Sequence, residues 1–202
     1  MVDTSELTEN SKDYIEKLKN GRMKMEKEKK KVLIVIDVQN DFVTGSLGTP
    51  EAQKVVPNII NKVNEYNERD DAIIFTADTH RDDYLNTQEG KKLPISHCIV
   101  GTNGWNFVPE LGIYEPSPME KIYIKEQFGY NWNKCPWLNA YDIEVIGLVT
   151  DICVVSNALI LKAAFPENKI TVDASCCAGS TPEKHKAALE VMKSCQINVI
   201  GE

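Results

Sequence analysis

The sequence predicts an α/β fold, a three-layer Rossmann-like parallel sheet flanked by helices, and three observations support this prediction. Residues 32–36 and 72–77 are continuous aliphatic and β-branched runs, as in strands buried on both faces. Residues 51–68 carry apolar side chains on one helical stripe. Strand-like and helix-like segments then alternate to the end of the chain, which is typical of parallel sheets with helical crossovers.

Each element is predicted from its own local pattern. Thr181 and Pro182 favour a helix start, because threonine caps helices well and proline suits the first helical position. Residues 79–108 show little periodicity, so we expect a long loop region there, and such loops usually carry function. The predicted strands are residues 32–36, 72–77, 121–125, 143–149, 169–174 and 197–200, and the predicted helices are residues 51–68, 152–164 and 181–194.

The chain divides into a charged, partly helical N-terminal extension, residues 1–31, and one folded domain, residues 32–202. Apolar residues are sparse in the extension, and residues 24–31 (KMEKEKKK) form a charge run that is typical of a solvated surface. A helix over residues 11–19 would be marginal by itself. We therefore expect the extension to pack on the domain or on a neighbouring subunit, or to fray.

Composition excludes several classes of function. The 202 residues carry a formal net charge of −7, which argues against nucleic-acid or membrane partners, because both favour a basic surface. There is no apolar run of the ~20 residues that a membrane span needs. The polar N-terminus lacks the apolar core of a secretory signal, so we expect a cytoplasmic protein whose six cysteines stay reduced.

Cys153 lies where a predicted strand turns into a predicted helix. The first turn of a helix offers unpaired N–H groups and a partial positive charge, so a thiol there tends to ionise more readily. This position favours a nucleophile. The alternative is a small buried hydrophobic residue, since the neighbours of Cys153 are aliphatic.

Chemically active residues follow four predicted strands at equivalent positions: Asp37, Asp78, Lys125 and the turn before Cys153. Parallel sheets bind ligands at the carboxyl ends of their strands, so we expect these side chains to converge. Asp37 can take the thiol proton and later protonate a leaving group, while Lys125 can hold the carboxylate and favour the thiolate. The alternative is an ordinary salt bridge between Asp37 and Lys125.

A second cluster comprises Asp78, His80, Glu89 and His97. Oxygen and imidazole ligands suit a divalent metal, with zinc, iron(II) and manganese as the candidates. The alternative is a set of solvated loop residues. His185, the remaining histidine, lies in a charged helical segment and is expected at the surface.

Four motifs in order carry a family resemblance: IDVQNDF (36–42), ADTH (77–80), HCIVGT (97–102) and GLVTDICV (147–154). Over residues 32–201 the chain resembles nicotinamidases and the wider isochorismatase-like cysteine hydrolases, whose fold agrees with the prediction above. The resemblance implies a catalytic triad of Asp37, Lys125 and Cys153. It further implies metal ligands at Asp78, His80, Glu89 and His97, an oxyanion hole from the N–H groups of Val149 and Cys153, a cis peptide at Leu148–Val149, and a pocket aromatic at Phe42.

The resemblance implies hydrolysis of nicotinamide to nicotinate and ammonia through a cysteine thioester, with a divalent metal, most often zinc, that holds the pyridine nitrogen in nicotinamidases. One departure concerns the substrate: nicotinamidases usually have Trp or Tyr before the ligand at His97, whereas this chain has Ser96. Another small amide therefore stays open as the substrate. The helix after Cys153 also differs from the usual alanine- and threonine-rich run.

The nucleophile candidate Cys153 and the predicted metal cluster distinguish this chain from other activities of the same superfamily. True isochorismatases lack the nucleophilic cysteine, and carbamoyl amidases lack the metal cluster. A non-catalytic binding or redox-sensing protein on this fold is the remaining alternative. The expected partners are a small-molecule amide and further copies of the chain in a homo-oligomer, an interface that the N-terminal extension could join.

Overall fold

The computed structural model describes residues 29–112 and 122–202, and residues Lys31–Glu202 form one compact unit. Most of the predicted N-terminal extension, including its helix over residues 11–19, lies outside the described residues and stays a prediction. Among the described residues there is no helix both long enough and apolar enough to cross a bilayer.

The domain is built on a six-stranded parallel sheet of order β3-β2-β1-β4-β5-β6, which confirms the predicted fold class. All six predicted strands are present, with small shifts at their ends. Their bounds are β1 Lys30–Ile36, β2 Ala72–Asp78, β3 Ile122–Lys125, β4 Tyr141–Leu148, β5 Ile170–Ala178 and β6 Asn198–Ile200.

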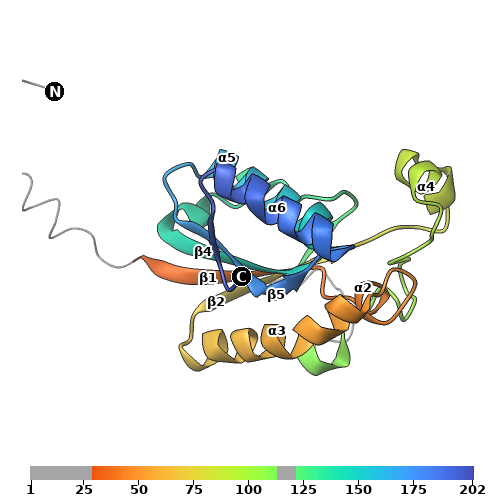
Figure 1. Cartoon of the computed structure of the whole chain (residues 1–202), viewed down its shortest axis with the longest axis horizontal. Helices are drawn as coiled ribbons and strands as arrows, with labels where there is room; N and C mark the ends of the chain where they lie inside the picture. Colours follow the sequence, from red (N-terminus) through yellow and green to blue (C-terminus); the bar gives the residue numbers. More distant parts are fainter. Residues whose placement is uncertain (1–28, 113–121) are drawn as a thin grey trace, which may run out of the picture. The chain divides into compact units, whose positions relative to one another are not determined.

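Helices cover both faces of the sheet, α3 on one side and α5 with α6 on the other (Figure 1). A short helical turn, Thr150–Val154, leads into α5 and carries Cys153. The helix bounds are α2 Asn40–Val43, α3 Pro50–Glu68, α4 Gln88–Lys92, α5 Val155–Ala164 and α6 Pro182–Ser194.

The central strand β1 shows why the sheet needs helices on both faces. Its side chains alternate in direction, so Leu33 and Val35 pack into the core on the α3 side, while Val32, Ile34 and Ile36 pack on the α5–α6 side. All five side chains are fully buried. Burial of each stabilises the fold by roughly 1.5–3 kcal/mol.

Two of the long helices begin at threonine caps followed by proline. Thr181 Oγ1 accepts the N–H of Lys184 at 3.2 Å, as the sequence predicts, and Thr49 Oγ1 accepts the N–H of Ala52 at 3.0 Å. These bonds satisfy N–H groups that would otherwise lack a partner in the first helical turn.

The structure departs from the prediction in two places. The expected long loop over residues 79–108 contains α4 and a short 3-10 turn, Tyr84–Asn86. With five residues including Gly90, α4 is too short to show an apolar stripe, and it is recognisable only by its Thr87 cap. The helix expected from residue 152 begins instead with the turn at Thr150.

The strand order reverses between β1 and β4, and this reversal creates a crevice at their carboxyl ends. The two strands approach so closely there that a side chain at position 147 would collide with the backbone of Ile36. Only glycine fits at this point. Gly147 also has a φ of +122°, which side chains disfavour. The residues following β1 and β4 therefore meet in one place.

Candidate active site

The nucleophile candidate Cys153 lies on the helical turn directly after β4 and is 3% exposed. The peptide bond Leu148–Val149, which joins β4 to this turn, is cis, as the resemblance predicts. Val149 O accepts the N–H groups of Ile152 and Val154 at 3.1 and 3.2 Å, so the turn folds back on the residue that follows the cis bond. Cys153 is thereby held at the carboxyl edge of the sheet.

Lys125 brings together the residues that follow the neighbouring strands. Its Nζ lies 2.7 Å from Asp37 Oδ2, 2.9 Å from Asp78 Oδ1 and 3.5 Å from Cys153 Sγ. The contact with Asp37 is an ion pair without good hydrogen-bond alignment. The sequence prediction that side chains from four strands converge is therefore matched by their positions.

Thr76 belongs to the site but was missed by sequence reasoning. The Thr76 hydroxyl donates to Asp37 Oδ1 at 2.7 Å. On the sheet, Thr76 of β2 lies opposite Ile36 of β1, the residue before Asp37. Thr76 is fully buried. The sequence signal for Thr76 is a single polar side chain in the interior of the otherwise apolar strand AIIFTAD. This strand, β2, is the neighbour of β1, which ends just before Asp37.

Two carboxylates share one ammonium, and this sets their protonation. Burial raises the pKa of Asp37, and the neighbouring Asp78 adds to this, although Lys125 opposes it. Burial also favours a neutral Asp78, but Lys125, His80 and His97 together lower its pKa well below the ordinary value. Asp37 is therefore the carboxyl that readily holds a proton, and Asp78 is the ionised one.

The Cys153 thiol does not ionise more readily than an ordinary thiol, so that sequence expectation is wrong. Burial raises its pKa well above the usual range, and the nearby Asp37 and Asp78 carboxyls raise it further, while Lys125 only partly opposes them. Burial would lower the pKa of Lys125, yet Asp37, Cys153 and Asp78 hold it well above normal. Formation of the thiolate therefore needs a base beside it, the position that Asp37 occupies.

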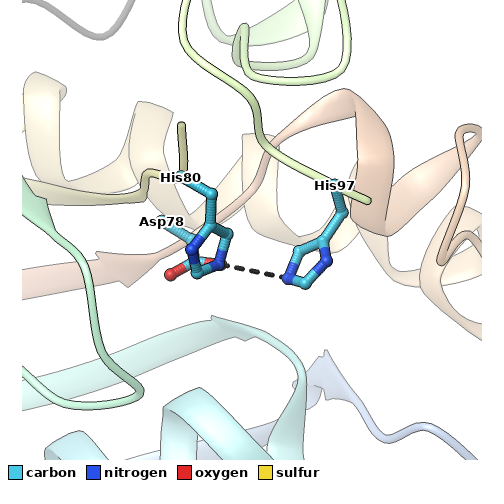
Figure 2. Close-up of side chains that lie close together, drawn as sticks. All are labelled: Asp78, His80 and His97. Atoms are coloured by element: carbon cyan, nitrogen blue, oxygen red, sulfur yellow. Dashed lines mark hydrogen bonds and ion pairs between the residues drawn. The ribbon is translucent and has the colours of Figure 1, made fainter. Parts of the chain in front are cut away.

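The second cluster gathers around the other oxygen of Asp78 (Figure 2). Asp78 Oδ2 lies 3.1 Å from His80 Nε2 and 3.5 Å from His97 Nε2. Glu89 Oε1, on α4, lies 3.8 Å from both of these nitrogens. Asp78, His80 and His97 are buried and offer ligand atoms within 4.8 Å of one another.

The donor set fits a divalent metal such as zinc. Two imidazole nitrogens and carboxylate oxygens are the ligands of such ions, and Glu89 stands within reach as a further one. His97 Nδ1 lies 2.8 Å from the carbonyl oxygen of Ile95. Because a carbonyl only accepts hydrogen bonds, this nitrogen carries the proton, and Nε2 is left with a lone pair for a metal.

A cavity of about 290 Å³ joins the two clusters. Cys153 and Val149 line it beside the ligand candidates Asp78, Glu89 and His97. Its apolar wall includes Phe42, as the resemblance predicts, and also Leu47, Leu93, Phe128 and Ile152. The cavity is therefore large enough for a small organic molecule with one face toward the thiol.

Contacts from the segment after β5 brace the Cys153 turn. Asp151 accepts the N–H and the hydroxyl of Ser180, each at 2.7 Å. Thr150 Oγ1 forms a 2.8 Å hydrogen bond with His185 Nδ1. The expectation that His185 is a surface residue is therefore wrong: it is half-buried on α6, and burial lowers its pKa.

Asn157 ties the same turn to the chain segment at residues 128–132. Its Nδ2 donates to the carbonyl of Cys153 at 2.8 Å, and its Oδ1 accepts Tyr130 N–H and Trp132 Nε1–H at 2.9 Å each. Asn157 is fully buried. Sequence reasoning missed it, although its place four residues after Cys153 in a helical run puts it on the same face.

Comparison with known proteins agrees with this geometry. The sequence model of the isochorismatase domain family matches residues 31–201 of this chain. A nicotinamidase/pyrazinamidase from Mycobacterium tuberculosis is 25% identical over 191 residues, which cover 84% of this chain and 98% of that protein. A nicotinamidase from Schizosaccharomyces pombe is 26% identical, with 84% of this chain and 92% of that protein covered.

Solved structures give the same result. A pyrazinamidase of Pyrococcus horikoshii in complex with zinc superposes with a TM-score of 0.70 at 26% identity, covering 86% of this chain and 99% of that one. A nicotinamidase from Bacillus subtilis superposes with a TM-score of 0.69 at 26% identity, covering 84% of this chain and 98% of that one. The chain therefore belongs to the isochorismatase family and is close to the nicotinamidases within it.

Proposed function

We propose that this protein is a metal-containing cysteine amidohydrolase whose substrate is nicotinamide, which it converts with water to nicotinate and ammonia. The chain is an amidohydrolase of carbon–nitrogen bonds, as its family and its relatives indicate. The observation that carries the proposal is the position of Lys125 Nζ, within 3.5 Å of Asp37, Asp78 and Cys153. An acid, an amine and a sulfur in one cluster, with the sulfur lining the cavity, are what amide cleavage through a thioester requires.

In the proposed first half-reaction, Asp37 accepts the Cys153 proton and the sulfur attacks the carboxamide carbon. The N–H groups of Val149 and Cys153 receive the developing oxyanion, and one such donor is worth about 3 kcal/mol. Asp37 then gives its proton to the departing nitrogen, so that ammonia leaves and a thioester remains. The raised pKa of Asp37 suits both the acceptance and the release of this proton.

In the second half-reaction, water replaces ammonia at the same position. Asp37 takes a proton from this water, the hydroxide adds to the thioester carbon, and the acid departs as the thiol regains its proton. Lys125 holds the Asp37 carboxylate in place throughout. Asp78, His80, Glu89 and His97 would hold a divalent metal, which supplies a Lewis acid that orients a ring nitrogen of the substrate.

A second candidate, an amidase for another small amide, is favoured by one observation. The aromatic residue that nicotinamidases usually have before the His97 position is Ser96 in this chain, and its carbonyl accepts the Ser46 hydroxyl. The ring that would stack on pyridine from this side is therefore missing, and the apolar wall comes from Phe42, Leu93 and Phe128 instead.

Ammonia release from nicotinamide tests the proposal. The purified protein should release one ammonia per nicotinate formed, and removal of bound metal with a chelator should reduce the rate, with recovery on addition of zinc. Cys153→Ala should abolish the reaction while the chain stays folded. Full turnover by the alanine variant, or no ammonia from the metal-loaded protein, would contradict the proposal.

A further inference from the structure

A second hollow, which we call the outer groove, adjoins the candidate active-site cavity. Its walls are Gln88, Glu89, Lys92, Leu93, Phe128 and Ile152, and it encloses about 570 Å³. Glu89, Leu93, Phe128 and Ile152 also line the 290 Å³ cavity that holds Cys153. The two spaces therefore adjoin each other along these four side chains, and a molecule bound at the thiol lies beside the groove.

Phe128 is the main apolar surface of the outer groove and is 46% exposed. A ligand that covers this ring removes apolar surface from water, which favours binding. The backbone around it is held firmly: the Phe128 carbonyl accepts Asn157 Nδ2 at 3.2 Å, and the N–H of Tyr130 donates to Asn157 Oδ1 at 2.9 Å. Gly129 between them packs against Ile160, whose side chain would have to move to admit a larger residue there. The ring is therefore presented by a rigid segment.

The other apolar walls of the groove are anchored as well. The Leu93 carbonyl accepts the hydroxyl of the buried Tyr84 at 3.0 Å, and Thr87 caps α4 beside it by accepting the N–H of Gly90 at 3.0 Å. Ile152 belongs to the braced turn that carries Cys153. A preformed site of this kind loses little conformational entropy when a ligand binds, which favours binding.

We propose that the outer groove is a substrate subsite and that the enzyme acts on aromatic carboxamides with a flat apolar substituent, which lies between Phe128 and Leu93. The inference rests on the proposed amidase function and deepens it, because it assigns the substrate class. The shared wall argues for this occupant, because a molecule seated in the groove lies beside the cavity that Cys153 lines. Phe128 then determines specificity through contact with the substituent.

The test compares two substrates, nicotinamide and 5-phenylnicotinamide, with the metal-loaded full-length enzyme. The wild-type enzyme should hydrolyse the phenyl-substituted amide with a kcat/KM at least equal to that for nicotinamide. Phe128→Ala should lower kcat/KM for both amides, because Phe128 also lines the cavity beside Cys153. The loss should be about tenfold or more larger for the substituted amide than for nicotinamide, mainly through KM. Phe128→Leu, which keeps an apolar wall, should recover part of the loss.

Trp137→Ala is the matched control, because Trp137 is a 43% exposed aromatic residue that lines neither space. It should leave both substrates unaffected. Turnover of nicotinamide with none of the substituted amide would overturn the subsite alone, whereas no turnover of either amide would overturn the proposed function as well. A change of mass per particle in Phe128→Ala would mean that a second copy of the chain covers the groove, which also overturns the inference.

Discussion

Asp78 is the residue through which the two halves of the site communicate. Its Oδ1 pairs with Lys125 at 2.9 Å, and its Oδ2 lies 3.1 Å from His80 Nε2. The register of the sheet explains this double role, since Asp78 and Lys125 are direct partners at the carboxyl ends of β2 and β3. Asp37 pairs with Lys125 and accepts the Thr76 hydroxyl, each at 2.7 Å, and among the described residues no ion pair joins it to a histidine.

This difference predicts two distinct phenotypes. Asp37→Asn should lower kcat by about 10²- to 10⁴-fold, because proton transfer is lost, while the metal content per chain stays at the wild-type value. Asp78→Asn should lower the metal content as well as kcat. Elemental analysis of the purified variants together with ammonia-release kinetics measures both. Loss of metal from Asp37→Asn would show that the two clusters are not separable in this way.

The helical turn Thr150–Val154 is the element on which the proposed chemistry depends, because it carries Cys153. Side chains hold it from two directions: Asp151 and Thr150 are bound from the segment after β5, and Asn157 binds the Cys153 carbonyl from α5. Gly179 permits the first contact, because a side chain there would meet both Asp151 and His185. The position of the sulfur is therefore set by neighbouring elements.

Asp151→Ala should release the turn from Ser180, and Asp151 itself does not line the cavity. We expect kcat to fall by about tenfold to a hundredfold with a smaller change in KM, since a small misplacement of a nucleophile is costly. The free energy of unfolding should fall by about 1–3 kcal/mol as the Ser180 N–H loses its acceptor. Asp151→Asn, which keeps an acceptor oxygen, should recover most of kcat. Urea unfolding and steady-state kinetics check this, and equal losses in both variants would argue against the bracing role.

Sequence patterns predict secondary-structure elements when the pattern is local and long enough to show a period. The buried strands, the Thr181 cap and the strand-end positions of Asp37, Asp78 and Lys125 are local patterns, and the structure matches them. The α4 helix and the contact of His185 with Thr150 were beyond prediction. The first is too short for periodicity, and the second joins residues that only tertiary packing brings together.

The thiol of Cys153 gives the clearest case of a local rule overridden by its surroundings. A helix start favours the thiolate, but complete burial beside two carboxyl groups raises the pKa instead. Burial of this kind depends on the whole fold and cannot be read from the sequence near Cys153.

At the scale of the whole molecule, a polar cluster fastens α3 to strands β4 and β5 of the sheet. Lys62 on α3 lies 2.9 Å from both Glu144 on β4 and Asp173 on β5. Tyr66 adds a 2.7 Å hydrogen bond to Glu144, and the Ser175 hydroxyl donates to Asp173 at 2.6 Å. Burial would raise the pKa of Asp173, but the hydrogen bonds from Ser175 and Lys62 lower it below the ordinary value.

A lowered carboxyl pKa makes stability depend on pH in a defined direction. Asp173 stabilises the fold fully above its unfolded pKa of about 4, and this contribution is lost as the pH falls through the lower folded-state value. Lys62→Met should therefore lower the free energy of unfolding by about 1.5–3 kcal/mol at pH 7 and by clearly less at pH 3. Urea unfolding at both pH values measures the difference, and a penalty that is the same at pH 3 would contradict it.

The strand order has one more consequence, which concerns the time at which the site is made. Its candidate metal ligands all lie within residues 78–97, whereas Asp37 and Cys153 come from β1 and β4, neighbours in the sheet that are distant in the chain. A ribosome releases the chain from its N-terminus, so the candidate ligands His80 and His97 emerge before Cys153. A nascent chain thus carries its metal-binding groups while it still lacks the atom that would react.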